Sequence, residues 1–477
     1  MFLAPSTFRA MKSVGSIATS FSQGLEISNS ELLGGLVTLN RFYHDLQGRL
    51  NEEHAAHRAN AALTAGQLKQ PARYTRFALA SYGWRALYFF NRGVTLIDGA
   101  KGNSDVTCML QYLELAPEDL IGYDFRSSEV FRSSYFVAYD RENDALVLSI
   151  RGTMSIKDML VDLACEYEKW CGGLVHSGMK ATAYWLFAKV MPQLLGYAKK
   201  QGITSIRLVG HSLGASTAAV LAILLFENRD KLRGLGIDVD ALDVQAFCYG
   251  AAPCVSRNLA ARYEHCIHTF VNGNDIVPRL CYGSFVEFKQ LVVAAANETD
   301  NLSQRLQSTF QTAEVNQKRW RDKFDRLLKA RDNLQQQKNY VYLHLPGSIY
   351  HITTDTSGSA SDDADRAPHS GRRGEEGNAG DPRASAATAA AAANCHQGDI
   401  SDGGSRRASE YSRRLSGEKS AQTWVLPASI NDFTEVVLRS SMIYEHFPST
   451  YEAAFVRAMQ TQAEQQADDA SRLSSDR

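Results

Sequence analysis

Apolar residues near the N-terminus recur at helical spacing. One helix face would carry five of them, three or four residues apart: Leu32, Leu36, Leu39, Phe42 and Leu46. A second stretch, residues 74–90, is rich in aromatic side chains. We predict that residues 28–98 are mainly helical and cover the core of the protein. The alternative for residues 74–90 is a surface that contacts lipid.

The pattern then changes to runs of β type separated by helical stretches. The β-type runs are residues 134–140, 145–152, 205–209, 244–250, 267–271 and 345–353. The first two flank a polar turn and predict a hairpin, whereas the runs at 244–250 and 267–271 have the continuous apolar character of buried parallel strands. The helical stretches between the runs are residues 156–170, about 175–201 and 215–226. This alternation predicts an α/β fold.

Two long segments do not fit the alternation. Residues 302–338 are charged and carry apolar residues at roughly helical intervals, so we predict a long helix. It would be either a mobile cap over the site or a helical insertion packed on the flank. Residues 356–421 consist mainly of Ser, Gly, Asp, Arg and Ala, and cannot bury enough apolar surface to fold. We therefore predict that they are disordered.

The predicted organisation is one α/β core with appended segments. In chain order we expect a flexible segment at residues 1–27, a helical extension at 28–133, the core at 134–355 including the helical insertion, the disordered insertion at 356–421, the rest of the core at 422–460 and a polar tail at 461–477. The first segment contains Arg9 and Lys12 and no acidic residue before Glu26. It fits a transit-like or membrane-surface segment, although a poorly ordered tail is the simpler interpretation.

Composition argues against several classes of protein. A formal net charge of −1 over 477 residues gives no basis for nucleic-acid binding. The eight cysteines form neither a Cys-x-x-Cys pair nor a Cys/His metal spacing, so we expect reduced thiols in a cytoplasmic protein, with no metal and no other cofactor. The sequence also lacks an apolar run of about 18 residues or more, the length that a membrane-spanning helix needs.

The strongest chemical signal is the Gly-x-Ser-x-Gly pentapeptide at residues 210–214. A β-type run precedes it and an apolar helical run follows. A nucleophilic serine must stand on a sharp, strained turn between strand and helix, where glycines on both sides avoid steric clashes. The N-terminus of the following helix would offer N–H groups to an oxyanion. We predict that Ser212 is a nucleophile; the alternative is a chance Gly/Ser turn.

Two further residues lie where a serine hydrolase needs them. Thr153 follows a predicted strand, and its backbone N–H could supply an oxyanion donor; an ordinary N-cap threonine is the alternative. Asp275 follows the run 267–271 in a turn-rich segment, which suits an acid that orients a catalytic base. The alternative for Asp275 is a structural Asx-turn residue.

Three histidines are candidates for the base that a serine hydroxyl needs. We exclude His211 because it is adjacent to Ser212 on the turn, so its side chain points elsewhere. His351 and His446 both follow Asp275, as the chain order Ser, Asp, His requires. His351 lies within a predicted strand, whereas His446 lies in a loop after the last one. Position favours His446 and leaves His351 as the alternative base.

Four motifs follow one another along the chain: SIRGT at residues 149–153, VHSGM at 175–179, GHSLGA at 210–215 and NGNDIVPR at 272–279. Together they resemble the class 3 lipase family, and most of all its sn-1-specific diacylglycerol lipases. Residues 433–451 are similar to the diacylglycerol lipase block that carries the catalytic histidine, and residues 73–84 to the segment before the catalytic domain. The resemblance covers about residues 70–290 and 340–460.

The resemblance implies an α/β-hydrolase fold with a mostly parallel central sheet flanked by helices. It also implies a Ser212–Asp275–His446 triad, with Thr153 and Leu213 as oxyanion donors, that hydrolyses an acylglycerol through an acyl-enzyme. The alternatives are a phospholipase A1, a triacylglycerol lipase, a general carboxylesterase or a non-catalytic lipase-like binding or signalling protein. The transmembrane bundle of animal diacylglycerol lipases has no counterpart in these residues.

An insoluble substrate predicts peripheral association with a membrane or lipid-droplet surface. The candidate contacts are the aromatic segment and the helix at residues 302–338. Arg-Arg-x-Ser units at Ser409 and Ser416 are typical of substrates of basophilic kinases, although chance within an Arg/Ser-rich tract is the simpler explanation.

Overall fold

The computed structural model of the chain describes residues 27–54, 58–99, 104–125, 132–153, 167–234, 236–300, 308, 311–337, 339–355 and 421–475. The chain divides into two units, Met1–Thr353 with Thr423–Arg477, and Thr354–Gln422. The central sheet and the helices around it lie in the first unit. The predictions for residues 1–26 and 356–420, including those for Ser409 and Ser416, lie outside the described residues.

An eight-stranded sheet forms the centre of the first unit, in the strand order β1-β2-β3-β6-β7-β8-β9-β10. Its strands are β1 (Leu120–Asp124), β2 (Tyr135–Asp140), β3 (Ala145–Ile150), β6 (Ser205–His211), β7 (Asp243–Tyr249), β8 (Ile267–Asn272), β9 (Ser348–Thr354) and β10 (Thr423–Ala428). β2 pairs antiparallel with β1 and with β3, as the predicted hairpin requires, whereas β3, β6, β7, β8 and β9 run parallel to one another. This mostly parallel sheet confirms the predicted α/β-hydrolase fold.

The apolar runs of the central strands follow from burial on both faces. On β3, Leu146 and Leu148 belong to the hydrophobic core on one side of the sheet, and Val147 to the core on the other. All three side chains are fully buried. A strand that is covered on both faces needs this continuous apolar pattern, because successive side chains point in opposite directions.

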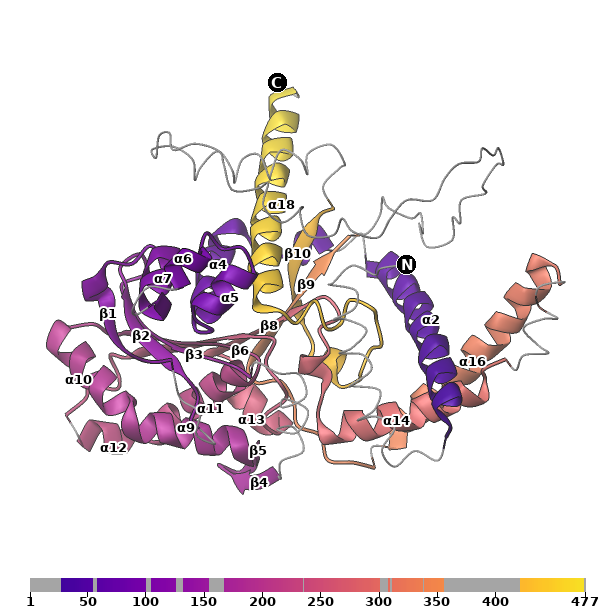
Figure 1. The fold of residues 1–477 in the computed structure, drawn as a ribbon, viewed down its shortest axis with the longest axis horizontal. Helices are drawn as coiled ribbons and strands as arrows, with labels where there is room; N and C mark the ends of the chain where they lie inside the picture. The colour runs from indigo at the N-terminus through magenta and orange to yellow at the C-terminus, as the bar shows by residue number, and fades with distance from the viewer. Residues whose placement is uncertain are drawn as a thin grey trace, which may run out of the picture. The chain divides into compact units, whose positions relative to one another are not determined.

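Helices cover both faces of the sheet (Figure 1). One face carries α9 (Ser177–Lys189), α10 (Met191–Gln201), α11 (Leu213–Glu227), α12 (Arg229–Gly234) and α13 (Arg257–Arg262). The other carries α4 (Ala65–Ala80), α5 (Trp84–Phe89), α6 (Leu96–Gly99), α7 (Ser104–Leu113) and the first turns of α18 (Pro448–Ser475). α11 is buried along almost its whole length because it packs against the sheet and α9 together.

Two helical predictions between β3 and β6 need correction. Residues 154–166 lie outside the described residues, but Tyr167–Trp170, predicted as the end of a helix, form β4, which pairs antiparallel with β5 (Gly173–His176). The helix predicted over residues 175–201 is two helices, α9 and α10. α10 has a proline in its first turn. Since proline lacks an N–H and clashes with the preceding turn, a helix can begin there but cannot continue through it.

β1 lies within residues 28–133, which were predicted to be a helical extension. The strand is only partly buried, and Tyr123 is 49% exposed, because β1 is the outermost strand and pairs on one side only. A short, half-exposed run that contains a glycine has neither a continuous apolar pattern nor a clear alternation. The helical prediction is confirmed for α4 to α7, α2 (Asn29–His54) and α3 (Arg58–Ala61). Short 3₁₀ helices lie at Pro117–Asp119, Val277–Arg279 and Ile430–Phe433.

The described part of the predicted helix 302–338 is α16 (Ala313–Gln337), which packs on the flank of the core. Trp320 of α16 donates its indole N–H to the carboxylate of Asp45 on α2 at 2.7 Å. The rings of Phe324 and Phe42 lie 5.0 Å apart between the same two helices. α14 (Tyr282–Asn297) packs against both of them. These contacts favour the flank insertion over a mobile cap.

The polar tail predicted at residues 461–477 continues α18 as far as Ser475. The buried hydroxyl of Thr461 accepts a hydrogen bond from the backbone N–H of Thr423, at the start of β10 (3.0 Å). Beyond this anchor the described side chains are mostly exposed, and alanine, glutamine and glutamate favour a helix without a core to pack on. Neither α18 nor any other helix in the described ranges is long and apolar enough to cross a membrane.

The chain leaves the sheet at the end of β9 and re-enters it at β10, which is the neighbouring strand. Just beyond the strand ends, the backbone N–H of Asp355 donates to the carbonyl oxygen of Gln422 at 2.8 Å. Residues 355 and 422 are therefore adjacent in space although they are far apart in sequence.

Candidate active site

Ser212 lies on a strained turn between β6 and α11, as the pentapeptide predicts. Its φ of 58° and ψ of −130° are unusual for a residue with a side chain. A Cβ atom at Gly214 would overlap with the carbonyl oxygen of Ile150, and a Cβ at Gly210 would overlap with the backbone of Gly214. Glycine is needed at both positions because β3, β6 and α11 approach so closely here.

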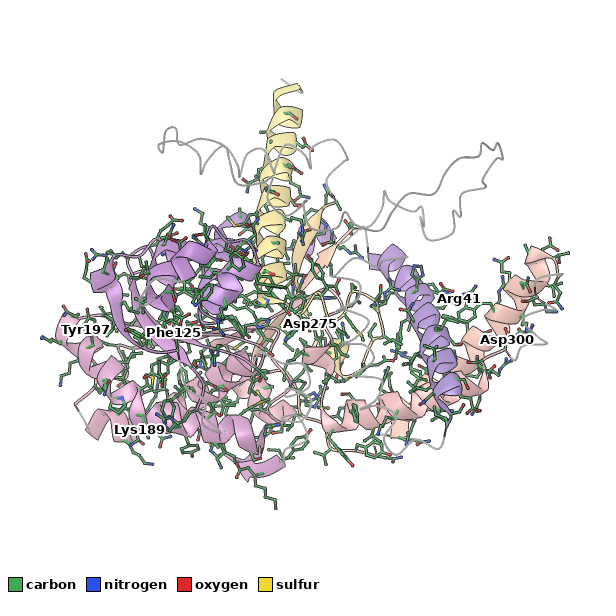
Figure 2. All side chains as sticks on the ribbon, in the orientation of Figure 1. Arg41, Phe125, Lys189, Tyr197, Asp275 and Asp300 are labelled. Atoms are coloured by element: carbon green, nitrogen blue, oxygen red, sulfur yellow. The ribbon has the colours of Figure 1, made fainter. Side chains whose placement is uncertain are left out.

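A chain of hydrogen bonds links Ser212, His446 and Asp275. His446 Nε2 lies 3.0 Å from Ser212 Oγ, and His446 Nδ1 lies 2.9 Å from Asp275 Oδ2. Asp275 follows β8, His446 precedes α18, and all three side chains are buried. Figure 2 labels Asp275 among the side chains near the base of α18. This geometry suits a proton relay in which Nε2 accepts the serine proton while Nδ1–H donates to the carboxylate.

Asp275 accepts further hydrogen bonds that balance the burial of its charge. Oδ1 accepts the backbone N–H of Val277 at 2.9 Å, which is the bond expected of an Asx-turn residue. Oδ2 accepts the hydroxyl of Tyr451 at 2.6 Å in addition to His446. Both interpretations of Asp275 therefore apply at once, since one oxygen shapes the turn and the other faces the histidine.

Tyr451 contacts this carboxylate, and the sequence did not single it out. Its hydroxyl donates to Asp275 and accepts the backbone N–H of Asn272 at 3.1 Å. Burial, and then the nearby Asp275 charge, raise the pKa of Tyr451 well above its ordinary value, so the phenol stays a neutral donor. The only sequence signal was its position five residues after His446, which does not distinguish it from other aromatic residues of α18.

His211 is not the base, as expected, but it supports the base. Its Nε2 lies 2.6 Å from the backbone oxygen of His446, and its Nδ1 lies 2.8 Å from the hydroxyl of Tyr82. Because a carbonyl oxygen only accepts, Nε2 carries the proton and Nδ1 accepts from the tyrosine. Burial lowers the pKa of His211 well below its ordinary value, so the ring is neutral. No pattern in the sequence predicted that Tyr82 would form a hydrogen bond with His211.

The position beside Ser212 Oγ is taken by His446, whereas the hydrogen bond of His351 goes to the turn that carries Asp275, so the geometry favours His446 over the alternative base. Its Nε2 donates to the carbonyl oxygen of Gly273 at 2.7 Å, and Phe433 packs edge-on against its ring. Burial is the main reason that the pKa of His351 is lowered to about 4. His351 therefore supports the turn that carries Asp275.

Polar contacts also fix the loop that carries His446. The carboxylate of Glu435 accepts two hydrogen bonds from Arg331 of α16, at 2.8 and 2.9 Å to the guanidinium Nε. Glu445 Oε2 accepts the backbone N–H of Asn274 at 2.6 Å, which joins the histidine loop directly to the turn of Asp275. The carbonyl oxygen of Glu445 also accepts from the side chain of Asn272. The two contacts of Glu445 thus connect the base to the acid, and the Arg331 bonds connect the same loop to α16.

The segments that carry the predicted oxyanion donors lie next to Ser212. A Cβ atom added to Gly152 would lie 3.0 Å from Ser212 Cβ, so the turn that leads to Thr153 lies directly against the serine. Leu213 is the first residue of α11, where backbone N–H groups have no intrahelical acceptor. The N-cap alternative for Thr153 concerns residues 154–166, outside the described residues. Within the described ranges, no cluster of histidine, cysteine or acidic side chains could hold a metal ion.

Residues 147–285 match the protein family described as "Lipase (class 3)". The matched range begins in β3, ends in α14, and contains Thr153, Ser212 and Asp275. This central segment of the chain is therefore similar to class 3 lipases. His446 lies beyond the matched range, so its assignment to the lipase domain depends on its contacts with Ser212 and Asp275.

Relatives of the lipase domain include diacylglycerol lipases. Diacylglycerol lipase-beta of Mus musculus is 26% identical over 252 residues, which cover 46% of this chain and 35% of the relative. Diacylglycerol lipase-alpha of Homo sapiens is 26% identical over 269 residues, 46% of this chain and 24% of the relative. Secreted mono- and diacylglycerol lipase A of Penicillium cyclopium is 26% identical over 168 residues, 34% of this chain and 50% of the relative. The chain thus spans between a quarter and half of the length of these relatives.

Solved structures similar to the lipase domain include fungal lipases. A lipase from Rhizopus microsporus var. chinensis is 19% identical, with a TM-score of 0.37, over 47% of this chain and 72% of that lipase. A fungal lipase in complex with an inhibitor is 23% identical, with a TM-score of 0.36, over 47% of this chain and 78% of the other. These scores are low, and the sheet order itself defines the fold.

Replacing Tyr451 by phenylalanine should slow the reaction of Ser212 with a fluorophosphonate about tenfold. Loss of a hydrogen bond to a buried carboxylate costs about 1.5–3 kcal/mol, part of which would appear as poorer orientation of His446. The matched control is Tyr249→Phe, because the Tyr249 hydroxyl is also buried and donates to the carbonyl oxygen of Pro71 at 2.6 Å. Equal labelling rates for the two variants would contradict a positioning role for Tyr451.

Stability should fall as pH decreases from about 6.5 towards about 4, and His351 should contribute to that fall. The folded protein holds the pKa of His351 at about 4, below the ordinary value of 6.5 that the unfolded chain restores. The unfolded chain therefore binds more protons in this window, and the contribution is fully present only above it. His351→Gln should make the slope of melting temperature against pH shallower between pH 7 and pH 5. An unchanged slope would contradict the lowered pKa.

Proposed function

We propose that this chain is a serine-dependent lipase that hydrolyses acylglycerol esters through an acyl-enzyme intermediate. The observation that carries the proposal is the buried hydrogen-bonded chain from Ser212 through His446 to Asp275. The serine occupies a strained turn at the N-terminus of α11, which is the geometry that an activated nucleophile needs.

In the proposed reaction, Ser212 Oγ attacks the ester carbonyl while His446 Nε2 takes its proton. The negative charge that develops on the carbonyl oxygen is stabilised by backbone N–H groups of Thr153 and Leu213. His446 then returns the proton to the departing alcohol, which leaves the fatty acyl group on the serine. Water enters, His446 removes one of its protons, and the fatty acid is released as the serine regains its hydrogen.

Asp275 contributes to each of these steps without exchanging a proton itself. Its charge lies next to the imidazole Nδ1, so it stabilises the imidazolium that forms whenever His446 accepts a proton. The additional bonds from Tyr451 and Val277 keep the carboxylate in one orientation. Because the site is buried, these electrostatic interactions are stronger than they would be in water.

The substrate class is proposed from the names of the relatives. Two are called diacylglycerol lipases and one a mono- and diacylglycerol lipase, so we propose an acylglycerol, with diacylglycerol preferred. Phospholipase A1, triacylglycerol lipase and general carboxylesterase activities remain alternatives within the same chemistry. A non-catalytic binding or signalling role is the alternative outside it, and the filled triad positions argue against that role.

We further propose that the protein is cytoplasmic and associates peripherally with a membrane or lipid-droplet surface, because an acylglycerol substrate resides in such a lipid phase. Phosphorylation at Ser409 and Ser416 stays a prediction from the repeated Arg-Arg-x-Ser units.

Ser212→Ala should reduce turnover of a water-soluble short-chain ester at least about a thousandfold, since the nucleophile is lost. His446→Ala should have a similar effect, whereas His351→Ala should cost less than about tenfold because that ring only supports the turn of Asp275. Circular dichroism spectra and melting temperatures would show that each variant is folded. Wild-type turnover by purified Ser212→Ala protein would rule out the assignment.

A panel of lipids should show diacylglycerol cleaved about tenfold faster or more than phosphatidylcholine and triacylglycerol, since specificity at this level needs only one or two pocket contacts. Fatty-acid release is the measurement, with Ser212→Ala protein as the blank. Preferential cleavage of phosphatidylcholine would replace the proposal by a phospholipase. If no lipid or ester is cleaved and a fluorophosphonate does not label Ser212, the non-catalytic alternative is correct.

A further inference from the structure

A continuous row of aromatic rings leads from the end of α5 to the loop of His446. Ring centroids are 5.0 Å apart between Phe89 and Phe90, 5.9 Å between Phe90 and Phe447, and 6.1 Å between Phe447 and Tyr444. These four residues are called the aromatic ridge below. Its two ends are strongly exposed, Phe89 by 61% and Tyr444 by 65%. Phe447, inside the row, is the residue next to His446.

The exposed face of α5 has an unusual composition for a surface helix. Ala86 and Leu87 point into the core, while Arg85, Tyr88 and Phe89 are exposed on the outer side. A helix on a globular surface normally turns polar residues outward and keeps its aromatic residues inside. Adjacent exposed aromatic side chains form a contiguous apolar patch, and such patches mark surfaces that bind a partner.

Two exposed arginines lie close to the ridge. Arg85 and Arg457 are both exposed, Arg457 lies within electrostatic range of Tyr444, and neither forms an ion pair within the described part of the chain. The nearby acid Glu452 is already paired with Arg92 at 2.8 Å. Aromatic side chains flanked by unpaired arginines match the boundary of an anionic lipid layer, where rings lie at headgroup depth and cations meet lipid phosphates and carboxylates.

The ridge is held firmly to the catalytic loop. Arg92, just after α5, donates to the carbonyl oxygen of Ser449 at 3.1 Å and forms the ion pair with Glu452. Both partners lie in the first turns of α18, directly after the His446 loop. A lipid layer that binds Phe89 and Tyr444 would therefore be held at a fixed position relative to His446, one residue from Phe447.

We propose that the aromatic ridge, together with Arg85 and Arg457, is the surface by which this protein binds an anionic lipid layer. The proposal rests on the proposed lipase function and names where the lipid phase meets the chain. A lipid layer, rather than a second protein, suits the ridge because the ridge adjoins the site that must receive a lipid substrate.

The test uses the full chain and co-sedimentation with vesicles of phosphatidylcholine, with and without phosphatidylserine. The double variant Phe89→Ser/Tyr444→Ser should lower the partition coefficient on phosphatidylserine-containing vesicles about tenfold or more, since two aromatic anchors are removed. The matched control is Leu33→Ser/Val37→Ser on α2, where the side chains are equally exposed, by 65% and 63%. This control should bind as the wild type does.

The charge contribution is tested separately with Arg85→Gln/Arg457→Gln. This variant should lose most of the preference for phosphatidylserine-containing vesicles while keeping the binding to phosphatidylcholine. Hydrolysis of a water-soluble short-chain ester should stay at the wild-type rate in all three double variants. A wild-type protein that binds vesicles but cleaves no ester would refute the lipase function and leave the ridge supported.

Two outcomes would contradict the proposal that the aromatic ridge binds lipid. One is undiminished vesicle binding by Phe89→Ser/Tyr444→Ser protein, or a loss equal to that of the α2 control. The other is a wild-type protein that does not bind vesicles and that forms a dimer in analytical ultracentrifugation, while the Phe89→Ser/Tyr444→Ser variant is a monomer. That result would assign the ridge to a protein contact instead.

Discussion

The carboxylate of Asp275 is completely buried, and the arrangement of the site depends on how its charge is satisfied. Its hydrogen bonds come from Val277 in its own turn, from the His446 ring and from Tyr451 on α18. A buried anion without such donors would be strongly destabilising. The turn after β8, the histidine loop and the start of α18 must therefore be assembled together. This region therefore folds stably only when the residues of the triad are brought together.

The parts of the site that the sequence predicted are those encoded locally. The turn at Ser212 needs glycines within two residues on each side, so its signature is contiguous. Asp275 and His446 could be predicted as acid and base because they follow Ser212 in the chain order Ser, Asp, His. Tyr82 and Tyr451 could not, since each meets its partner from a distant segment and an aromatic residue on a helix is most often part of the core. His351 is a similar case, because only three-dimensional contacts show that it supports a turn.

The fold errors have a common physical origin. β1 and the end of α18 both lie at the margin of the core, where few side chains are buried and the apolar pattern is weak. The break between α9 and α10 depends on one proline, which periodicity alone does not detect. Central strands and α11 were predicted well because burial on all sides leaves a strong pattern in the sequence. The reliability of the pattern thus follows the depth of burial.

The hydrogen bond between Asp355 and Gln422 has a consequence for how the chain tolerates change. It joins the chain just after β9 to the chain just before β10, so residues 355 and 422 stay adjacent whatever the length of the sequence between them. The entropy of closing a loop grows only logarithmically with its length, by about 0.6 kcal/mol for each doubling. Residues can therefore be gained or lost in this connection at little thermodynamic cost, and Asp275 and His446 on either side of it remain in register.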